Sequence, residues 1–154
     1  MAVAKIFAIK QRKESKSLII LVDSSEMLNK YIDEISDKVT NLLKKTRKPT
    51  TIIYPIPKGL AKNVVAQDNT VAIRIVKKGF CHELIRLFGK PIVSTSANIS
   101  GHATPQSFKE IDTSILDAVD YVVNLQQNKI TYAPSKIIKI KSDGTLEVIR
   151  EQDL

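Results

Sequence analysis

The chain has one cysteine, Cys81, no tryptophan, and only 5% aromatic residues among its 154 residues. A single cysteine cannot form an internal disulfide, which favours a reducing compartment, so we expect a cytoplasmic protein. No apolar run approaches the roughly 20 residues that span a bilayer, and the first residues lack the pattern of a secretory signal. The sequence therefore predicts a protein without a membrane partner.

Familiar catalytic signatures are also absent. The sequence contains no Walker loop, no dinucleotide-binding fingerprint and no nucleophile elbow. Cys81 and His82 are neighbours on a predicted helix, so their side chains point in different directions, and no other cysteine or histidine has metal-ligand spacing. We expect Cys81 to be a packing residue and His82 to lie at the surface.

Charge is the first positive signal. The formal net charge of +8 attracts polyanions, either nucleotides or RNA, and raises their local concentration. Most lysines, Lys48 among them, lie in polar contexts typical of a solvated surface. The charge therefore indicates an acidic partner without identifying it.

The hydrophobic pattern predicts strands and helices that alternate in the first half of the chain. We expect helices over 3–10, 24–32, 35–43 and 81–88, with another starting near Pro105. We expect strands over 17–22, 49–54, 71–76, 91–95, 120–125, 136–141 and 145–148. The last two strands are joined by a hairpin signal at 142–144. This order predicts a single-domain α/β fold, a twisted open mixed sheet with flanking helices.

Residues 94–101, which read STSANISG, carry the most chemistry in the chain. Hydroxyl and amide groups beside small residues offer donors to phosphate or carboxylate oxygens and let the backbone approach a ligand. The stretch follows a predicted strand, and open α/β sheets bind ligands beyond the carboxyl ends of their strands. The alternative is a polar turn that caps the next helix.

Four cations accompany this stretch as candidates. Arg74 shares a predicted strand face with Ala72, and an arginine on an apolar face is costly unless it has a partner or a ligand. Arg74 is therefore a pocket residue or a structural ion-pair partner, and Arg150 is a similar candidate or simply the end of its strand. Lys10 and Arg12 end the first helix, where the helix dipole alone also favours cations.

Several short stretches together resemble a known family in their order and spacing across the chain. They are Lys10-Gln11-Arg12, Pro49-Thr50-Thr51, Val71-Ala72-Ile73-Arg74, Ser96-Ala97-Asn98, Pro134-Ser135-Lys136-Ile137-Ile138 and Val148-Ile149-Arg150. The set is similar to the YrdC-like family of threonylcarbamoyl-AMP synthases, which carries Lys-x-Arg, Ser-x-Asn and Pro-Ser-Thr-Val-Val motifs at the matching places.

The resemblance implies a nucleotidyltransferase that makes threonylcarbamoyl-AMP and pyrophosphate from L-threonine, bicarbonate and ATP for tRNA modification. Mg²⁺ is implied with the ATP, held by phosphate oxygens and water. The implied catalytic residues are Lys10 and Arg12. The implied ATP-binding residues are Ser96, Asn98, Ser135 and Arg150, and the pocket-shaping residues are Thr51, Arg74 and Ser94. Transfer RNA or double-stranded RNA is an additional implied partner.

The chain also departs from the family pattern. Residues 1–154 match a YrdC-like domain that lacks the family's N-terminal strand and loop, and Thr46-Arg47-Lys48 replaces a Trp-Pro-Gly stretch. Lys136 replaces a threonine, and Glu151 replaces a glycine. Two alternatives to the enzyme therefore remain: a module that binds nucleotide or double-stranded RNA without turnover, and an inactive fold with an unpaired strand edge beside residues 17–22.

Overall fold

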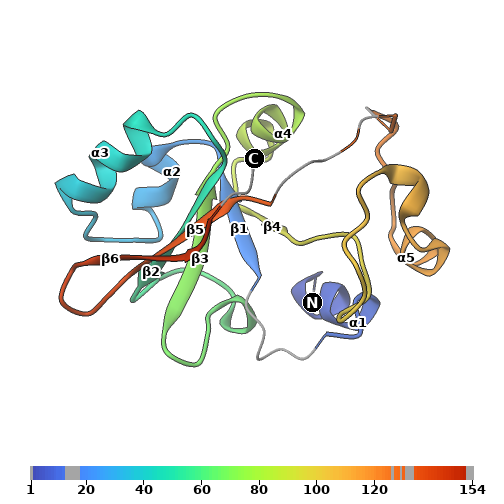
Figure 1. The fold of residues 1–154 in the computed structure, drawn as a ribbon, viewed down its shortest axis with the longest axis horizontal. Coiled ribbons are helices and arrows are strands. Elements are labelled where there is room, and N and C mark those ends of the chain that lie inside the picture. Colours follow the sequence, from blue (N-terminus) through green and yellow to red (C-terminus); the bar gives the residue numbers. More distant parts are fainter. Residues whose placement is uncertain (1, 13–17, 126, 129, 131–133, 152–154) are drawn as a thin grey trace.

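The computed structural model describes residues 2–12, 18–125, 127–128, 130 and 134–151. Within them, one mixed sheet has the strand order β4–β1–β3–β2–β5–β6 (Figure 1). The strands are β1 (Ile19–Val22), β2 (Thr50–Pro55), β3 (Thr70–Ile75), β4 (Ile92–Ser94), β5 (Lys136–Ile140) and β6 (Leu146–Arg150). β1 is parallel to β3 and β2 is parallel to β5, whereas the other neighbouring pairs are antiparallel. The predicted mixed sheet is confirmed.

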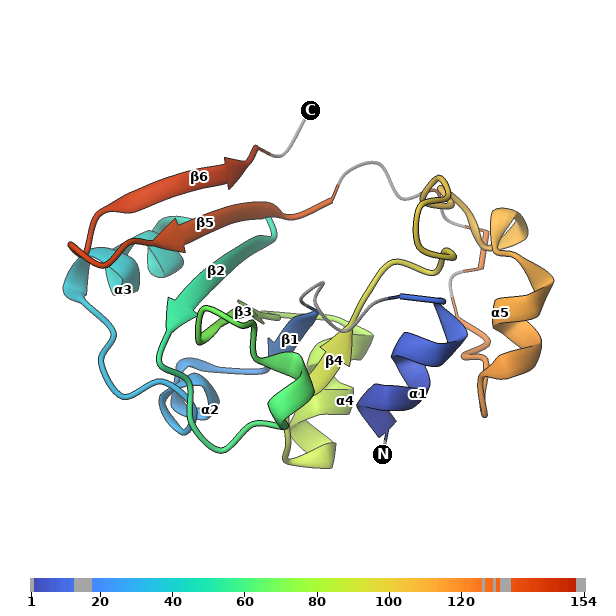
Figure 2. The same ribbon diagram turned by 90° about the horizontal axis from the view of Figure 1, so that it is seen from below.

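Five α-helices and two short 3₁₀ turns are present in the described residues. They are α1 (Ala2–Ile9), α2 (Ser25–Asn29), α3 (Asp37–Lys45), α4 (Phe80–Phe88) and α5 (Thr113–Ala118), with η1 (Lys62–Val64) and η2 (Phe108–Glu110). The helices α2, α3 and α4 lie along one side of the sheet, and α1 and α5 lie beyond β4, far from β6 (Figures 1 and 2). No described helix is long and apolar enough to cross a membrane.

The hydrophobic core lies on the helix-covered face of the sheet. Ile20, Ile73 and Ile52 are paired across β1, β3 and β2, and each is at most 2% exposed. Val39 of α3 and Ile85 of α4 are fully buried in the same cluster. Because alternate residues of a strand point to opposite faces, the partners one position away lie on the other face.

Ser and Gly residues set three of the helix boundaries. The Ser24 hydroxyl accepts a hydrogen bond from the Met27 amide at the start of α2, and Ser36 caps α3 in the same way. Gly89 ends α4 in the left-handed conformation with φ of 69°, which a residue without a side chain adopts at little cost.

Several sequence predictions are wrong in detail. The helix predicted over 24–32 ends at Asn29, and the helix expected after Pro105 is only the turn η2. The strand predicted over 120–125 is not part of the sheet, because these residues pair with no described strand. No unpaired edge lies beside β1, since β3 and β4 flank it on both sides.

Candidate functional site

Lys10 connects the end of α1 to the loop that follows β4. Its ammonium nitrogen donates to the carbonyl oxygens of Ser96 and Asn98, the latter at 2.6 Å, and to Asn98 Oδ1 at 3.2 Å. The Ser100 amide donates in return to the Lys10 carbonyl at 2.8 Å. The structure therefore brings together two predicted motifs that are 86 residues apart in the chain.

The loop has its own internal bonds. Ser96 Oγ donates to Asn98 Oδ1 at 2.6 Å, and Asn98 Nδ2 donates to the His102 carbonyl at 2.7 Å. The amide group of Asn98 thus accepts from two partners and donates to a third. These bonds hold the loop in one shape before any ligand arrives, which lowers the cost of binding.

Burial of Lys10 is the unusual part of this arrangement. Lys10 is only 3% exposed, and burial, followed by repulsion from Arg12, lowers the pKa of its ammonium group. The three N–H donors of the ammonium match the three oxygens that surround it. A buried cation is tolerated here because its hydrogen bonds are satisfied.

A second polar cluster lies at the start of β5. Thr51 Oγ1 and Ser135 Oγ are 2.9 Å apart and both residues are buried. The Arg150 guanidinium donates to the Ser135 carbonyl through Nε at 3.0 Å and Nη2 at 2.8 Å. The sheet register explains this cluster, because Thr51 pairs with Ile137 and Ile137 pairs with Arg150.

Arg74 lies on the same face of the sheet as these residues. Arg74 follows Ile73, and Thr51 precedes Ile52, the antiparallel partner of Ile73, so the pairing sets Thr51 beside Arg74. Ser94 of β4 also belongs to this face, since it pairs with Ile19 and Ile19 pairs with Ala72. The face without the main core therefore carries four of the predicted site residues, namely Ser94, Arg74, Thr51 and Arg150.

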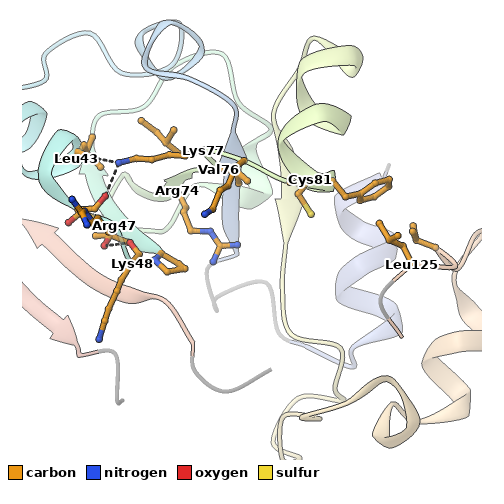
Figure 3. A pocket seen from close by; sticks show the side chains of 16 residues that line it. Leu43, Arg47, Lys48, Arg74, Val76, Lys77, Cys81 and Leu125 are labelled. Carbon is orange, nitrogen blue, oxygen red and sulfur yellow. Dashed lines mark hydrogen bonds between the residues drawn. The ribbon is translucent and has the colours of Figure 1, made fainter. Parts of the chain in front are cut away.

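A cavity of about 710 Å³ opens where β3 ends and β2 begins. Figure 3 shows Arg74 in the wall of this cavity, with Arg47 and Lys48 on one side and Cys81 and Leu125 on the other. Among the nine predicted site residues, Arg74 alone lines it. The remaining cations in its wall are Lys77 and Lys78.

The charges of this cavity are of one sign. No acidic side chain is among the described residues that line it. The ammonium group of Lys77 already has protein partners, because it donates hydrogen bonds to the Leu43 and Thr46 carbonyls at the end of α3. Arg74 has no hydrogen bond or ion pair with a described residue, and burial lowers the pKa of its guanidinium. An arginine in this setting is ready to pair with an anion.

Sequence reasoning missed several residues of this cavity. Lys48 is exposed, as its sequence context predicts, and it also lines the cavity, which the sequence did not indicate. Cys81 is exposed in the cavity wall and does not pack in the core, so that prediction is wrong. The His82 side chain is 25% exposed, so it lies partly at the surface as predicted, with Nδ1 2.8 Å from the Val76 carbonyl. The signal that could have identified residues 46–48 as cavity residues is their position directly before β2. Because β2 is antiparallel to β3, it begins beside the end of β3.

The loop and the cavity are at different ends of the sheet. β4 is antiparallel to β1. Its carboxyl end and the loop after it therefore lie at the end of the sheet opposite to the carboxyl ends of β1 and β3. Residues 94–101 follow the carboxyl end of β4 as expected, but they lie away from the carboxyl ends of the parallel strands β1 and β3. No hydrogen bond between described residues joins the Lys10 cluster to the Thr51 cluster.

Comparison with known proteins places this geometry in a family. The family model for Sua5, YciO and YrdC proteins, described as telomere recombination, matches residues 1–152. The chain belongs to the Sua5/YciO/YrdC family. The resemblance inferred from the short motifs is thus confirmed across nearly the whole chain.

Relatives in this family carry a common name. A threonylcarbamoyl-AMP synthase of Pseudoalteromonas translucida is 34% identical over 126 residues, which are 80% of this chain and 67% of the relative. A threonylcarbamoyl-AMP synthase of Vibrio cholerae is 30% identical over 153 residues, which are 97% of this chain and 79% of the relative.

Solved structures of the family share the fold. Sua5 of P. abyssi in complex with L-threonine has a TM-score of 0.86 and 26% identity, and the match covers 98% of this chain. The chain spans about half of that protein, 44% of its length. YciO of E. coli, at 21% identity and a TM-score of 0.81, matches 98% of this chain and 73% of its own length.

Proposed function

We propose that this chain is an L-threonylcarbamoyladenylate synthase, a nucleotidyltransferase that forms threonylcarbamoyl-AMP and pyrophosphate from L-threonine, bicarbonate and ATP. The observation that carries the proposal is the junction of Lys10 with the Ser96 and Asn98 backbone, which joins the Lys-x-Arg and Ser-x-Asn motifs. Relatives named for this activity and a family structure with bound L-threonine support it.

The reaction needs charge neutralisation and positioning more than a protein nucleophile. The threonine amine takes up bicarbonate with loss of water, and the carbamate oxygen attacks the α-phosphorus as the bond to pyrophosphate breaks. Cations beside the phosphate oxygens stabilise the charge in the transition state. Arg12, Arg74 and Arg150 are the guanidinium groups that we assign to this task, with Ser135 in the ATP-binding group.

Lys10 supports the reaction indirectly in this arrangement. All three donors of its ammonium group are directed at oxygens of residues 96 and 98. We therefore assign Lys10 to positioning the loop, so that Ser96 and Asn98 are held ready for the nucleotide. Its positive charge still adds to the field at the phosphates, because the surroundings are of low dielectric constant.

Mg²⁺ enters this proposal as part of the substrate. The described residues contain no group of three or more His, Cys, Asp or Glu side chains that could hold a metal ion. Their donor set fits an ion held by phosphate oxygens and water, which is the usual arrangement for Mg²⁺ with ATP.

A second function is supported by the positive cavity wall. Arg47 and Lys48 line both the large cavity and a smaller hollow of about 310 Å³, which Lys45 and the ion pair of Lys136 with Glu151 also line. Such a ridge of cations suits the phosphates of tRNA or double-stranded RNA. The alternative is therefore a nucleotide- or RNA-binding module without turnover. In either case we propose a cytoplasmic location.

The test is pyrophosphate release by this chain with Mg²⁺ and ATP, measured with and without L-threonine and bicarbonate. Release that requires both co-substrates supports the synthase. ATP binding by calorimetry without release, at saturating threonine, would refute the synthase and favour the binding module. Steep loss of RNA binding with added salt, measured on the same preparation, identifies phosphate contacts.

A further inference from the structure

Gln11, the middle residue of the Lys10-Gln11-Arg12 motif, has a left-handed backbone with φ of 49°. Among the described residues, Ile56 and Asn69 are the other non-glycine residues with positive φ. This conformation brings the side chain close to the backbone, so a residue other than glycine adopts it only where surrounding contacts stabilise it. The contacts around Gln11 therefore indicate what its conformation does.

Two hydrogen bonds at the end of α1 form the turn at Gln11. The Arg12 amide donates to the Phe7 carbonyl at 2.9 Å, and the Gln11 amide donates to the Ala8 carbonyl at 3.1 Å. This pair of bonds is the Schellman pattern that ends many helices, and glycine is the usual residue at its left-handed position. The backbone of Gln11 therefore ends the helix between the two cations of the motif.

The loop after β4 contributes a third bond, and it lies beside the end of α1 (Figure 2). The Ser100 amide donates at 2.8 Å to the Lys10 carbonyl, which is the group directly before Gln11. A carbonyl inside a continuing helix accepts instead from the amide four residues later. The left-handed turn thus leaves the Lys10 carbonyl available to the loop that the Lys10 ammonium group also contacts.

The turn also determines where Arg12 lies relative to Lys10. Residues two positions apart in a continuing helix are separated by about 200° around its axis, so their side chains point to opposite sides. Here burial and then the nearby charge of Arg12 lower the pKa of the Lys10 ammonium group. The turn therefore holds two positive charges near each other in spite of their repulsion, which suits a multiply charged anion.

The side chain of Gln11 has no part in these contacts. It is exposed and has no hydrogen bond with a described residue. Glycine reaches the left-handed region at little cost and keeps the backbone amide that donates to Ala8. Proline keeps neither feature, because its φ is fixed at about −65° and it has no N–H. These two substitutions therefore separate a role of the backbone from a role of the side chain.

We propose that Gln11 is a positioning residue of the nucleotide site, whose left-handed turn sets Lys10 against the loop after β4 and the Arg12 guanidinium beside it. The inference rests on the proposed function, in which Lys10 holds the loop and Arg12 neutralises charge on the phosphates. Gln11 does not touch the nucleotide, so its effect on ATP is transmitted through its two neighbours.

The experiment compares Gln11→Gly with Gln11→Pro by calorimetric titration with Mg²⁺ and ATP. Gln11→Gly should raise the urea midpoint of unfolding and change the ATP affinity by less than about twofold, because it keeps the turn without the strain. Gln11→Pro should weaken ATP binding by about tenfold, because Lys10 and Arg12 lose their positions. In an Arg12→Ala background the same substitution should cost less than about threefold, since much of its effect passes through Arg12.

A second measurement follows the turn without any ligand. Deuterium exchange of the Ser100 amide should be slow in the parent chain and in Gln11→Gly, and fast in Gln11→Pro, because the turn keeps the Lys10 carbonyl in place. Gln11→Val keeps the amide but disfavours the left-handed region, so it should shift exchange and ATP affinity in the same direction by a smaller amount.

Asn69→Pro is the matched control. Asn69 also has positive φ and donates its amide within a turn, to the Ala66 carbonyl at 2.9 Å. This variant should leave the Ser100 exchange and the ATP affinity as they are in the parent chain. Circular dichroism of all variants shows that the remaining fold is intact.

Three results would overturn the proposal. They are slow Ser100 exchange in Gln11→Pro, parental ATP affinity in Gln11→Pro, and a loss of ATP affinity in Gln11→Gly equal to that in Gln11→Pro. The last result would assign the side chain a contact with the nucleotide. Neither measurement needs turnover, so a parent chain that binds ATP without releasing pyrophosphate refutes the synthase alone. A parent chain that does not bind ATP overturns both proposals.

Discussion

Lys10 and Asn98 are joined twice, through the Asn98 carbonyl oxygen at 2.6 Å and through Oδ1 at 3.2 Å. This pair ties the first helix to the loop after β4, and the polar residues of the Ser-x-Asn motif are positioned by it. The contact is part-buried, with Lys10 itself only 3% exposed, so its loss removes hydrogen bonds that hold the loop in place.

Lys10→Ala and Asn98→Ala should each weaken ATP binding by roughly 1–3 kcal/mol, because each removes hydrogen bonds that hold the loop. Calorimetric titration with Mg²⁺ and ATP measures the change. Lys109→Ala, a substitution of a lysine on η2, is the control and should leave the affinity unchanged. Unchanged affinity in both loop variants would remove the loop from the nucleotide site.

The buried pair of Thr51 and Ser135 should behave as one unit. Thr51→Val leaves the Ser135 hydroxyl without its 2.9 Å partner, and we expect the free energy of unfolding to fall by about 1–3 kcal/mol. The double variant with Ser135→Ala should lose less than the sum of the single losses. Urea unfolding of the four proteins measures this coupling, and strictly additive losses would contradict it.

Cys81 offers a probe of the large cavity because it is the chain's sole cysteine and is exposed in the cavity wall. A maleimide should label it in the folded protein. If the nucleotide phosphates bind beside Arg74, saturating Mg²⁺ and ATP should slow the labelling severalfold, and Arg74→Ala should abolish the protection. A labelling rate indifferent to ATP would place the nucleotide outside this cavity.

Tyr54 should make the fold sensitive to alkali. Tyr54 is 1% exposed, and burial raises the pKa of its phenol well above the ordinary 10.0. Above about pH 10 the unfolded chain releases this proton while the folded protein keeps it, so stability falls as pH rises. Tyr54→Phe should remove that part of the pH dependence. Identical thermal melts of both proteins from pH 9 to 11 would contradict this account.

Local chemistry along the chain was sufficient to predict much of the fold. Ser24 marks a helix start and Gly89 marks a helix end because capping depends on neighbouring backbone groups alone, whereas Ser36, the cap of α3, fell inside the predicted helix over 35–43. The segment 120–125 shows the limit of such reasoning. Its pattern favours a strand, but a strand requires a partner, and no described strand pairs with it.

For the candidate site, too, some features could be predicted from the sequence and others depend on the tertiary structure. The short motifs identified the family and the residue types of the site, because those follow from order and spacing in the chain. Only the tertiary structure decided that Lys10 directs its donors at residues 96 and 98, and that Cys81 and Lys48 line a cavity with Arg74. These contacts join positions far apart in sequence, and strand direction and register, which local patterns do not determine, bring them together.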